Sequence, residues 1–296
     1  MTTATPGAPR SLDEGWAPPL PNGRPVVLPG RGTTFVRELP GPRGAPTLLL
    51  LHGWTASADL NWFTSFESLG RRYRVVAMDH RGHGRGIRSR RRFRLSDCAD
   101  DAAALIDELG TGPVIAVGYS MGGPIAQLLW RRHPERVAGL VLCATTRSFA
   151  TRAQEKLGFI AMGGASFAAR LTPGAARQAL ARRIFGERGD GTVASWIQRE
   201  VQRTDWTAVL EAGNALGRFD SSSWIGEVDV PTAVVATMLD GMVAPERQLA
   251  LARSIPGATL HPVQGDHTSC VTDARRFIPA LLAACSSVAA RLPRAA

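Results

Sequence analysis

The stretch Val114-Ile115-Ala116-Val117-Gly118-Tyr119-Ser120-Met121-Gly122 joins an apolar run to a G-x-S-x-G motif, and a helix-compatible segment, Pro124–Arg132, follows it. A serine hydroxyl is a weak nucleophile until a base takes its proton, and it must also project clear of its own backbone. A sharp turn from strand to helix exposes the hydroxyl, and small residues on both sides permit that turn. The stretch therefore predicts a nucleophilic Ser120 at a strand end.

Short apolar runs and helix-compatible segments alternate on both sides of this motif. The run Thr47–Leu51 is unbroken, which is typical of a strand covered on both faces, as in a parallel sheet. Strands are predicted at residues 47–51, 74–78, 114–119, 137–143, 232–238 and 259–263. Helices are predicted at residues 59–69, 96–109, 124–133, 245–254 and 272–291. This alternation predicts an α/β fold with a doubly wound, mostly parallel sheet.

Two regions depart from the alternation. Residues 1–23 are rich in proline and lack periodicity, so we expect a flexible N-terminal arm, followed by a β-hairpin from Pro25–Leu28 and Thr33–Leu39. Between Thr146 and Val228 the chain has helical patterns but no good strand. We therefore predict a core domain interrupted by a helical cap that lies over the carboxyl edge of the sheet. The predicted core is residues 24–145 and 229–296, and the predicted cap is residues 146–228.

Two more groups with acid–base chemistry follow predicted strands. Asp240 comes just after residues 232–238, and His267 comes just after residues 259–263. The carboxyl ends of parallel strands share one edge of a sheet, and the order serine, acid, histidine suits a nucleophile, an orienting acid and a base. Ser120 would attack, His267 would accept its proton, and Asp240 would fix the imidazole tautomer. Asp266 is a rival acid because it adjoins His267, but sequence neighbours rarely orient one another's side chains.

With these residues in view, the chain resembles the α/β-hydrolase superfamily. More narrowly, it resembles the bacterial esterase and cofactor-free haloperoxidase-like branch with a helical cap, over about residues 25–290. The resemblance is carried by His52-Gly53-Trp54, Asp79-His80-Arg81-Gly82-His83-Gly84, Gly118–Gly123, Asp240 and Gly265-Asp266-His267. It implies that the backbone N–H groups of Trp54 and Met121 form an oxyanion hole. It also implies that residues 79–86 are a structural turn rather than a metal or phosphate site.

The nucleophile position bears on the reaction. In this fold, dehalogenases and epoxide hydrolases carry aspartate where this chain has Ser120, so the resemblance favours acyl transfer through an acyl-serine intermediate. We therefore expect a serine hydrolase of carboxylic esters that needs no cofactor and no metal. Perhydrolase or haloperoxidase-like activity and C–C hydrolysis are alternatives with the same triad. Trp54-Thr55-Ala56 stands where C–C hydrolases typically have a glycine- and proline-rich loop, which ranks them lower. A receptor or signalling module on a hydrolase fold is the alternative from another class.

The predicted cap is rich in aromatic residues and methionines. Most of them must bury an apolar face on the sheet, but those above Ser120 should line a substrate pocket. The predicted lining residues are Trp54, Phe149, Phe159, Met162 and Met242. This composition predicts a small-molecule ester with an apolar acyl or alcohol group.

The formal net charge of +10 invites a nucleic-acid partner, but Lys156 is the only lysine and no nucleic-acid motif accompanies the arginine run 85–94. We expect no nucleic-acid partner, and interpret the run as a solvated face or a surface that steers an anionic substrate. The sequence shows no apolar stretch of membrane length and no secretory signal, which predicts a cytoplasmic protein without a membrane span. The widely spaced cysteines favour buried thiols over disulfides or a zinc site: Cys98, Cys143, Cys270 and Cys285.

Overall fold

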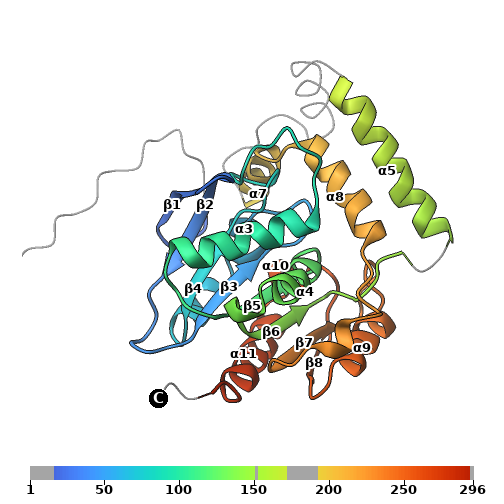
Figure 1. Cartoon of the computed structure of the whole chain (residues 1–296). Coiled ribbons are helices and arrows are strands. Elements are labelled where there is room, and N and C mark those ends of the chain that lie inside the picture. The colour runs from blue at the N-terminus through green and yellow to red at the C-terminus, as the bar shows by residue number, and fades with distance from the viewer. Residues whose placement is uncertain (1–16, 151–152, 172–192, 294–296) are drawn as a thin grey trace, which may run out of the picture.

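The computed structural model describes residues 17–150, 153–171 and 193–293 of the 296-residue chain. An eight-stranded sheet in the order β1-β2-β4-β3-β5-β6-β7-β8 runs through its centre (Figure 1). The strands are β1 Gly23–Leu28, β2 Gly32–Leu39, β3 Thr47–Leu51, β4 Arg74–Met78, β5 Val114–Tyr119, β6 Val137–Cys143, β7 Thr232–Thr237 and β8 Thr259–Val263. The pairs β1–β2 and β2–β4 are antiparallel and all other pairs are parallel. The predicted fold class and the N-terminal hairpin are confirmed.

Helices cover both faces of the sheet, and each buried strand divides its side chains between them. Leu49 and Leu51 of β3 join a core cluster with helices α3, α4 and α9, whereas Leu48 and Leu50 join a second cluster with α1, α2, α10 and α11. The first set of helices is α3 Leu95–Glu108, α4 Gly122–Arg132 and α9 Pro245–Ser254. The second set is α1 Ala58–Trp62, α2 Phe66–Gly70, α10 Ser269–Thr272 and α11 Ala274–Ala289. Because successive side chains of a strand point to opposite faces, an unbroken apolar strand fills two cores at once.

One predicted helix is wrong in extent, because the chain breaks it into two. The predicted helix 59–69 is α1 and α2, separated by a turn in which the Thr64 hydroxyl donates a hydrogen bond to the Cys270 carbonyl (2.6 Å). Apolar spacing continues across this break, so the local pattern could not reveal it. The predicted helix 272–291 corresponds to α11, and the short helix α10 precedes it, with Asp273 between the two.

Helices also make up the chain between β6 and β7, where α5 Ala153–Leu171, α7 Val193–Gln202 and α8 Trp206–Arg218 are described. Apart from one isolated bridge, Ser148 with Asp220, the described residues of this stretch form no strand pairing. Helix α8 reaches the loops that follow β3 and β4, since the Trp54 indole donates to the Val209 carbonyl and the Asp205 N–H donates to the Gly82 carbonyl (both 2.8 Å). These contacts lie at the carboxyl edge of the sheet.

The cap boundaries themselves stay a prediction, and residues 1–16 of the predicted arm lie outside the described residues. None of the described helices combines the length and the apolar character needed to cross a membrane.

Helix α5 lies outermost in Figure 1 and packs on α8 through glycines. A Cβ atom added at Gly217 would come within 2.3 Å of the Phe159 side chain, and one at Gly213 within 2.7 Å of the Met162 sulfur. Gly158 of α5, by contrast, has open space around it. The two α8 glycines therefore lie where α8 packs closely against α5, whereas Gly158 makes no close contact.

This difference predicts opposite effects of the same substitution. Gly158→Ala should raise the thermal unfolding midpoint, because alanine is favoured over glycine in a helix by about 1 kcal/mol. Gly217→Ala should lower it, because an overpacked contact costs about 1–3 kcal/mol and outweighs that gain. Thermal and urea unfolding of the two variants beside the parent protein test this. A Gly217→Ala protein as stable as Gly158→Ala would contradict the close packing of α5 on α8.

Candidate active site

Ser120 occupies the sharp turn between β5 and α4, and its backbone is in the left-handed region with φ 50°. A residue with a side chain rarely adopts this conformation, so the surroundings must hold it. The Ser120 N–H donates to the Cys143 carbonyl of β6 (2.9 Å), and the Ser120 carbonyl accepts from the Thr145 hydroxyl (2.8 Å) and the Gly123 N–H (2.9 Å). Every backbone polar group of this serine is therefore paired.

The glycines around Ser120 are required by close backbone approach. A Cβ at Gly118 would lie 2.2 Å from the Gly122 carbonyl oxygen, and one at Gly122 would lie 2.0 Å from the Leu51 carbonyl oxygen. Real Cβ atoms do not approach so closely, and backbone cannot move aside as a flexible side chain can. The G-x-S-x-G spacing thus has a steric cause in this chain, as the sequence motif predicted.

His267 lies in the loop after β8, and its ring meets Ser120 across 147 residues of sequence. The Ser120 hydroxyl lies 3.0 Å from Nε2 of His267. The Tyr119 hydroxyl donates to the main-chain carbonyl of His267 (2.7 Å), so the residue beside the serine also fixes the backbone of the histidine. The geometry lets the imidazole take a proton from the serine hydroxyl without a large movement.

Asp240 follows β7 and meets the other ring nitrogen, with 2.7 Å between its Oδ2 and Nδ1 of His267. Its Oδ1 accepts from the N–H groups of Met242 and Val243 (both 2.8 Å). Burial by itself raises the pKa of the Asp240 carboxyl, but the hydrogen bonds from His267 and from its other donors outweigh burial. Its pKa is therefore lower than usual, and the group is ionised at neutral pH.

The support around Asp240 includes two residues that sequence reasoning missed. The Thr237 hydroxyl (2.8 Å) and the Gln248 amide (3.2 Å) both donate to Oδ2 of Asp240. Both are fully buried, and Gln248 also donates to the Val243 carbonyl (2.7 Å). The sequence signal was only a glutamine on the helix predicted over residues 245–254, and neither its burial nor its partners could be inferred from it.

The rival acid, Asp266, lies apart from the ring of its neighbour. Its carboxylate is exposed and accepts from the N–H and hydroxyl of Thr268 (both 2.8 Å). Those bonds, chiefly the ones from Thr268, lower the pKa of Asp266. The structure thus brings Asp240, and not Asp266, against the imidazole.

Asp240→Asn should cost far more activity than Asp266→Asn. An asparagine at 240 does not keep His267 in the tautomer that carries its proton on Nδ1 and presents the Nε2 lone pair to Ser120. Loss of this tautomer costs about 10⁴-fold in kcat in a serine triad. Steady-state kinetics on an activated ester, with circular dichroism to show that both variants fold, provide the comparison. Greater damage from Asp266→Asn would reassign the acid.

The loop after β3 approaches the serine at Gly53, where an added Cβ would lie 3.4 Å from that of Ser120. The Gly53 N–H donates to the Asn61 side chain (2.8 Å). Within the described part of the chain, neither the Trp54 N–H nor the Met121 N–H donates to another residue. Two backbone donors beside Ser120 are thus available to an incoming oxygen atom, as the predicted oxyanion hole requires.

Three fully buried histidines form a cluster behind this loop. The ring of His52 lies 4.2 Å from that of His80 and 5.6 Å from that of His83, centroid to centroid. The Nε2 atom of His52 accepts from the His80 N–H (2.9 Å), so its Nδ1 carries the proton and donates to the Gly53 carbonyl (2.8 Å). The described residues contain no group of metal-ligating side chains suited to an ion. The cluster is neutral packing that also fixes Gly53.

Burial lowers the pKa of these imidazoles, to about 4 for His52, to about 3 for His83, and well below the usual value for His80. The folded protein therefore disfavours protonation that the unfolded chain accepts near pH 6.5. Stability is full above pH 6.5 and falls below it, with His52 and His83 each removing on the order of 2 kcal/mol by pH 5.

Urea unfolding at pH 7.5, 6.5, 5.5 and 5.0 should show this steep loss, and His83→Asn should reduce its slope by about one proton. A free energy of unfolding that stays flat from pH 6.5 to pH 5 would contradict the buried neutral cluster.

Three of the five predicted pocket residues pack against glycines of α8. Trp54 and Met162 meet over Gly213 of α8, where an added Cβ would lie 2.9 Å and 2.7 Å from their side chains. Phe159 packs one turn further on against Gly217. Phe149 is half-buried, and its carbonyl accepts from Arg247 (2.9 Å), whereas the Met242 side chain is 66% exposed. The four-residue spacing of Gly213 and Gly217 was a signal for a helix-packing face that sequence reasoning missed.

The arginine run of residues 85–94 has two parts. Arg85 is half-buried, binds Asp59 (2.6 Å) and lies over the Phe35 ring, and Arg88 donates to the carbonyls of Gly84 and Arg203.

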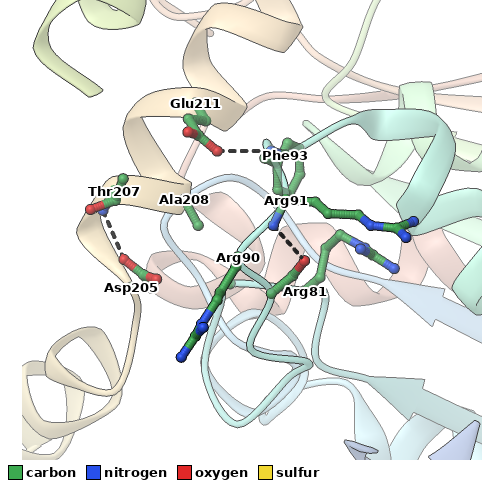
Figure 2. Close-up of a pocket in the computed structure, with 10 residues that line it drawn as sticks. Arg81, Arg90, Arg91, Phe93, Asp205, Thr207, Ala208 and Glu211 are labelled. Carbon is green, nitrogen blue, oxygen red and sulfur yellow. Dashed lines mark hydrogen bonds between the residues drawn. The ribbon is translucent and has the colours of Figure 1, made fainter. Parts of the chain in front are cut away.

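Arg90 and Arg91 are exposed and line a cavity of about 360 Å³ beside the start of α8, opposite Asp205 and Glu211 (Figure 2). The described lining of this cavity contains no member of the Ser120, Asp240 and His267 group.

Comparison with known proteins gives this geometry a context. A family model described as "alpha/beta hydrolase fold" matches residues 46–274. Epoxide hydrolase B of Mycobacterium tuberculosis is 34% identical over 120 residues, which cover 39% of this chain and 33% of that protein. A bifunctional esterase/perhydrolase of Acinetobacter calcoaceticus is 38% identical over 104 residues, or 34% of this chain and 37% of that protein. The matched segments thus span about a third of these relatives' length.

Among solved structures, a hydrolase from Pseudomonas aeruginosa superimposes with a TM-score of 0.72 at 23% identity, covering 89% of this chain and 98% of the other. At this identity the likeness concerns the fold alone. With these coverages the two chains share the overall fold over most of their length.

Proposed function

Because the chain belongs to the alpha/beta hydrolase fold family, we propose that it is a serine hydrolase that cleaves carboxylic esters through an acyl-serine intermediate. The observation that carries this proposal is the chain of contacts from Ser120 to His267 (3.0 Å) and from His267 to Asp240 (2.7 Å), anchored on a serine with φ 50°.

Each contact has a role in the proposed reaction. The Asp240 carboxylate accepts the Nδ1–H of His267, so the Nε2 lone pair faces the serine and takes its proton as Oγ attacks the ester carbonyl. The imidazolium then returns that proton to the leaving alcohol. A water molecule enters in place of the alcohol, gives its proton to His267 and hydrolyses the acyl-serine. Through both halves the N–H groups of Trp54 and Met121 bind the oxygen on which negative charge develops.

The chemistry of a hydroxyl nucleophile supports ester substrates over epoxides. Attack of Ser120 Oγ on an epoxide carbon would give an ether, which water does not readily cleave, so the enzyme would stop after one turnover. Attack on an ester carbonyl gives an acyl-serine, which water resolves. The name of the mycobacterial relative therefore does not carry over to this chain.

The apolar side chains packed on α8 support an apolar substrate group. Trp54, Met162 and Phe159 face α8 within two helical turns, and they would give an acyl or alcohol group an apolar wall. Perhydrolysis is the second candidate, because hydrogen peroxide can intercept the same acyl-serine and because one relative is named an esterase/perhydrolase.

Ser120→Ala should abolish hydrolysis of p-nitrophenyl butyrate, with a loss of about 10⁴-fold or more in kcat. Ser65→Ala is a matched control, because Ser65 is another buried serine and its hydroxyl has no partner among the described residues. The control should keep full activity.

Running the assay with and without hydrogen peroxide, and measuring peracid, separates hydrolysis from perhydrolysis. Ester turnover by a clean Ser120→Ala preparation would refute the mechanism. A folded wild-type protein with no turnover of any ester would favour a receptor function.

A further inference from the structure

The loop between β3 and α1 contains a second strained residue, Thr55, with φ 63°. The left-handed region is unfavourable for every L-residue with a side chain and most so for a β-branched one, in which two heavy atoms crowd the backbone. Such a conformation persists only where the surroundings hold it. Thr55 directly follows Trp54, whose N–H is assigned to the oxyanion hole in the proposed function, so whatever holds this loop also sets the position of that donor.

The first anchor is the side chain of Trp54 itself. Its indole N–H donates to the Val209 carbonyl of α8 at 2.8 Å, across 155 residues of sequence. Its six-membered ring packs on Gly213, one turn further along the same helix, where any side chain would collide with it. The indole is therefore held both by a hydrogen bond and by contact with the α8 backbone.

The second anchor lies on the other side of Thr55. The Ser57 hydroxyl accepts from the Leu60 N–H as the N-cap of α1 and donates to Oε2 of Glu200 on α7 (2.9 Å). Both side chains are buried, Ser57 at 1% and Glu200 at 3% exposure, and Oε1 of Glu200 pairs with Arg203 (2.8 Å). A hydrogen bond to a buried carboxylate is stronger than one between neutral groups.

We propose that helices α7 and α8 hold the strained loop in place, with Trp54 and Ser57 as positioning residues for the oxyanion-hole N–H of Trp54. This inference rests on the proposed function. The core fixes the start of the loop, through the bonds of Gly53 to His52 and Asn61, and the helices after β6 fix the rest. An oxyanion donor acts only when it lies about 2.7–3.1 Å from the developing charge, so a loop freed to relax loses transition-state stabilisation.

The test removes the indole N–H and keeps an aromatic ring. Trp54→Phe should lower kcat for p-nitrophenyl acetate about 10-fold with little change in KM, less than the 10²–10³-fold cost of losing an oxyanion donor outright. Trp130→Phe is the matched control, because its indole donates a similar bond to Asp229 (3.0 Å) from α4. The control should keep kcat. Glu200→Gln, which leaves an uncharged acceptor for Ser57, should lower kcat about 3-fold.

A second ester separates positioning from pocket lining. Positioning of the oxyanion donor predicts a loss of kcat/KM for p-nitrophenyl acetate as well as for p-nitrophenyl hexanoate, because both transition states need the N–H. Any additional loss for the hexanoate measures contact of the Trp54 side chain with the acyl chain. A loss confined to the hexanoate would mean that the Trp54 side chain only contacts the acyl chain, and it would overturn the proposal.

Amide hydrogen exchange of residues 52–57 provides a readout that does not need catalysis. These amides should exchange faster in Trp54→Phe and Glu200→Gln than in the parent protein, whereas Trp130→Phe should leave them unchanged. Unchanged exchange in both loop variants would overturn the proposal even if the protein is an active esterase. Faster exchange in both loop variants of a protein that hydrolyses no ester would instead support the role of Trp54 and Ser57 in holding the loop and refute the proposed function.

Discussion

The left-handed backbone of Ser120 is the constraint on which the rest of the site depends. That conformation is costly, and it is held because β5 and β6 are parallel neighbours, which places the Cys143 carbonyl within reach of the Ser120 N–H. It also needs glycine at 118 and 122, where β3 and the first turn of α4 pass too closely for any side chain. The turn directs the hydroxyl away from the sheet edge, toward the loops after β7 and β8, which carry Asp240 and His267.

Strain in this protein is concentrated at one edge of the sheet. Among the described residues, the non-glycine positions with positive φ are Thr55, Ser120 and Ala144, which follow β3, β5 and β6. Those three strands are adjacent in the order β3-β5-β6. Strained residues persist where surrounding contacts hold them, and they often mark functional sites. Here the contacts come from different elements: the Val235 carbonyl of β7 for Ala144, the Thr145 hydroxyl after β6 for Ser120, and helices α7 and α8 beside Thr55.

Local sequence pattern was sufficient for the strands, for the turn at Ser120, and for the order of Ser120, Asp240 and His267, because strand ends in a parallel sheet converge on one edge. It was insufficient wherever a side chain meets a partner distant in sequence. The Trp54 indole and Val209 are 155 residues apart, and no periodicity relates them. The same holds for Thr64 and Cys270, whose bond lies at the break in a helix that apolar spacing predicts as continuous. The burial of His52, His80 and His83 also depends on packing that spacing alone does not express.

The central claim is that Ser120 is a nucleophile activated by His267 and Asp240, and a covalent adduct tests it most directly. A fluorophosphonate ester should react once per chain, and peptide mass spectrometry should place the phosphonyl group on Ser120. His267→Gln should slow this labelling by several orders of magnitude, because the serine would lose its base. Labelling on another residue, or labelling that proceeds at the parent rate in His267→Gln, would contradict the account.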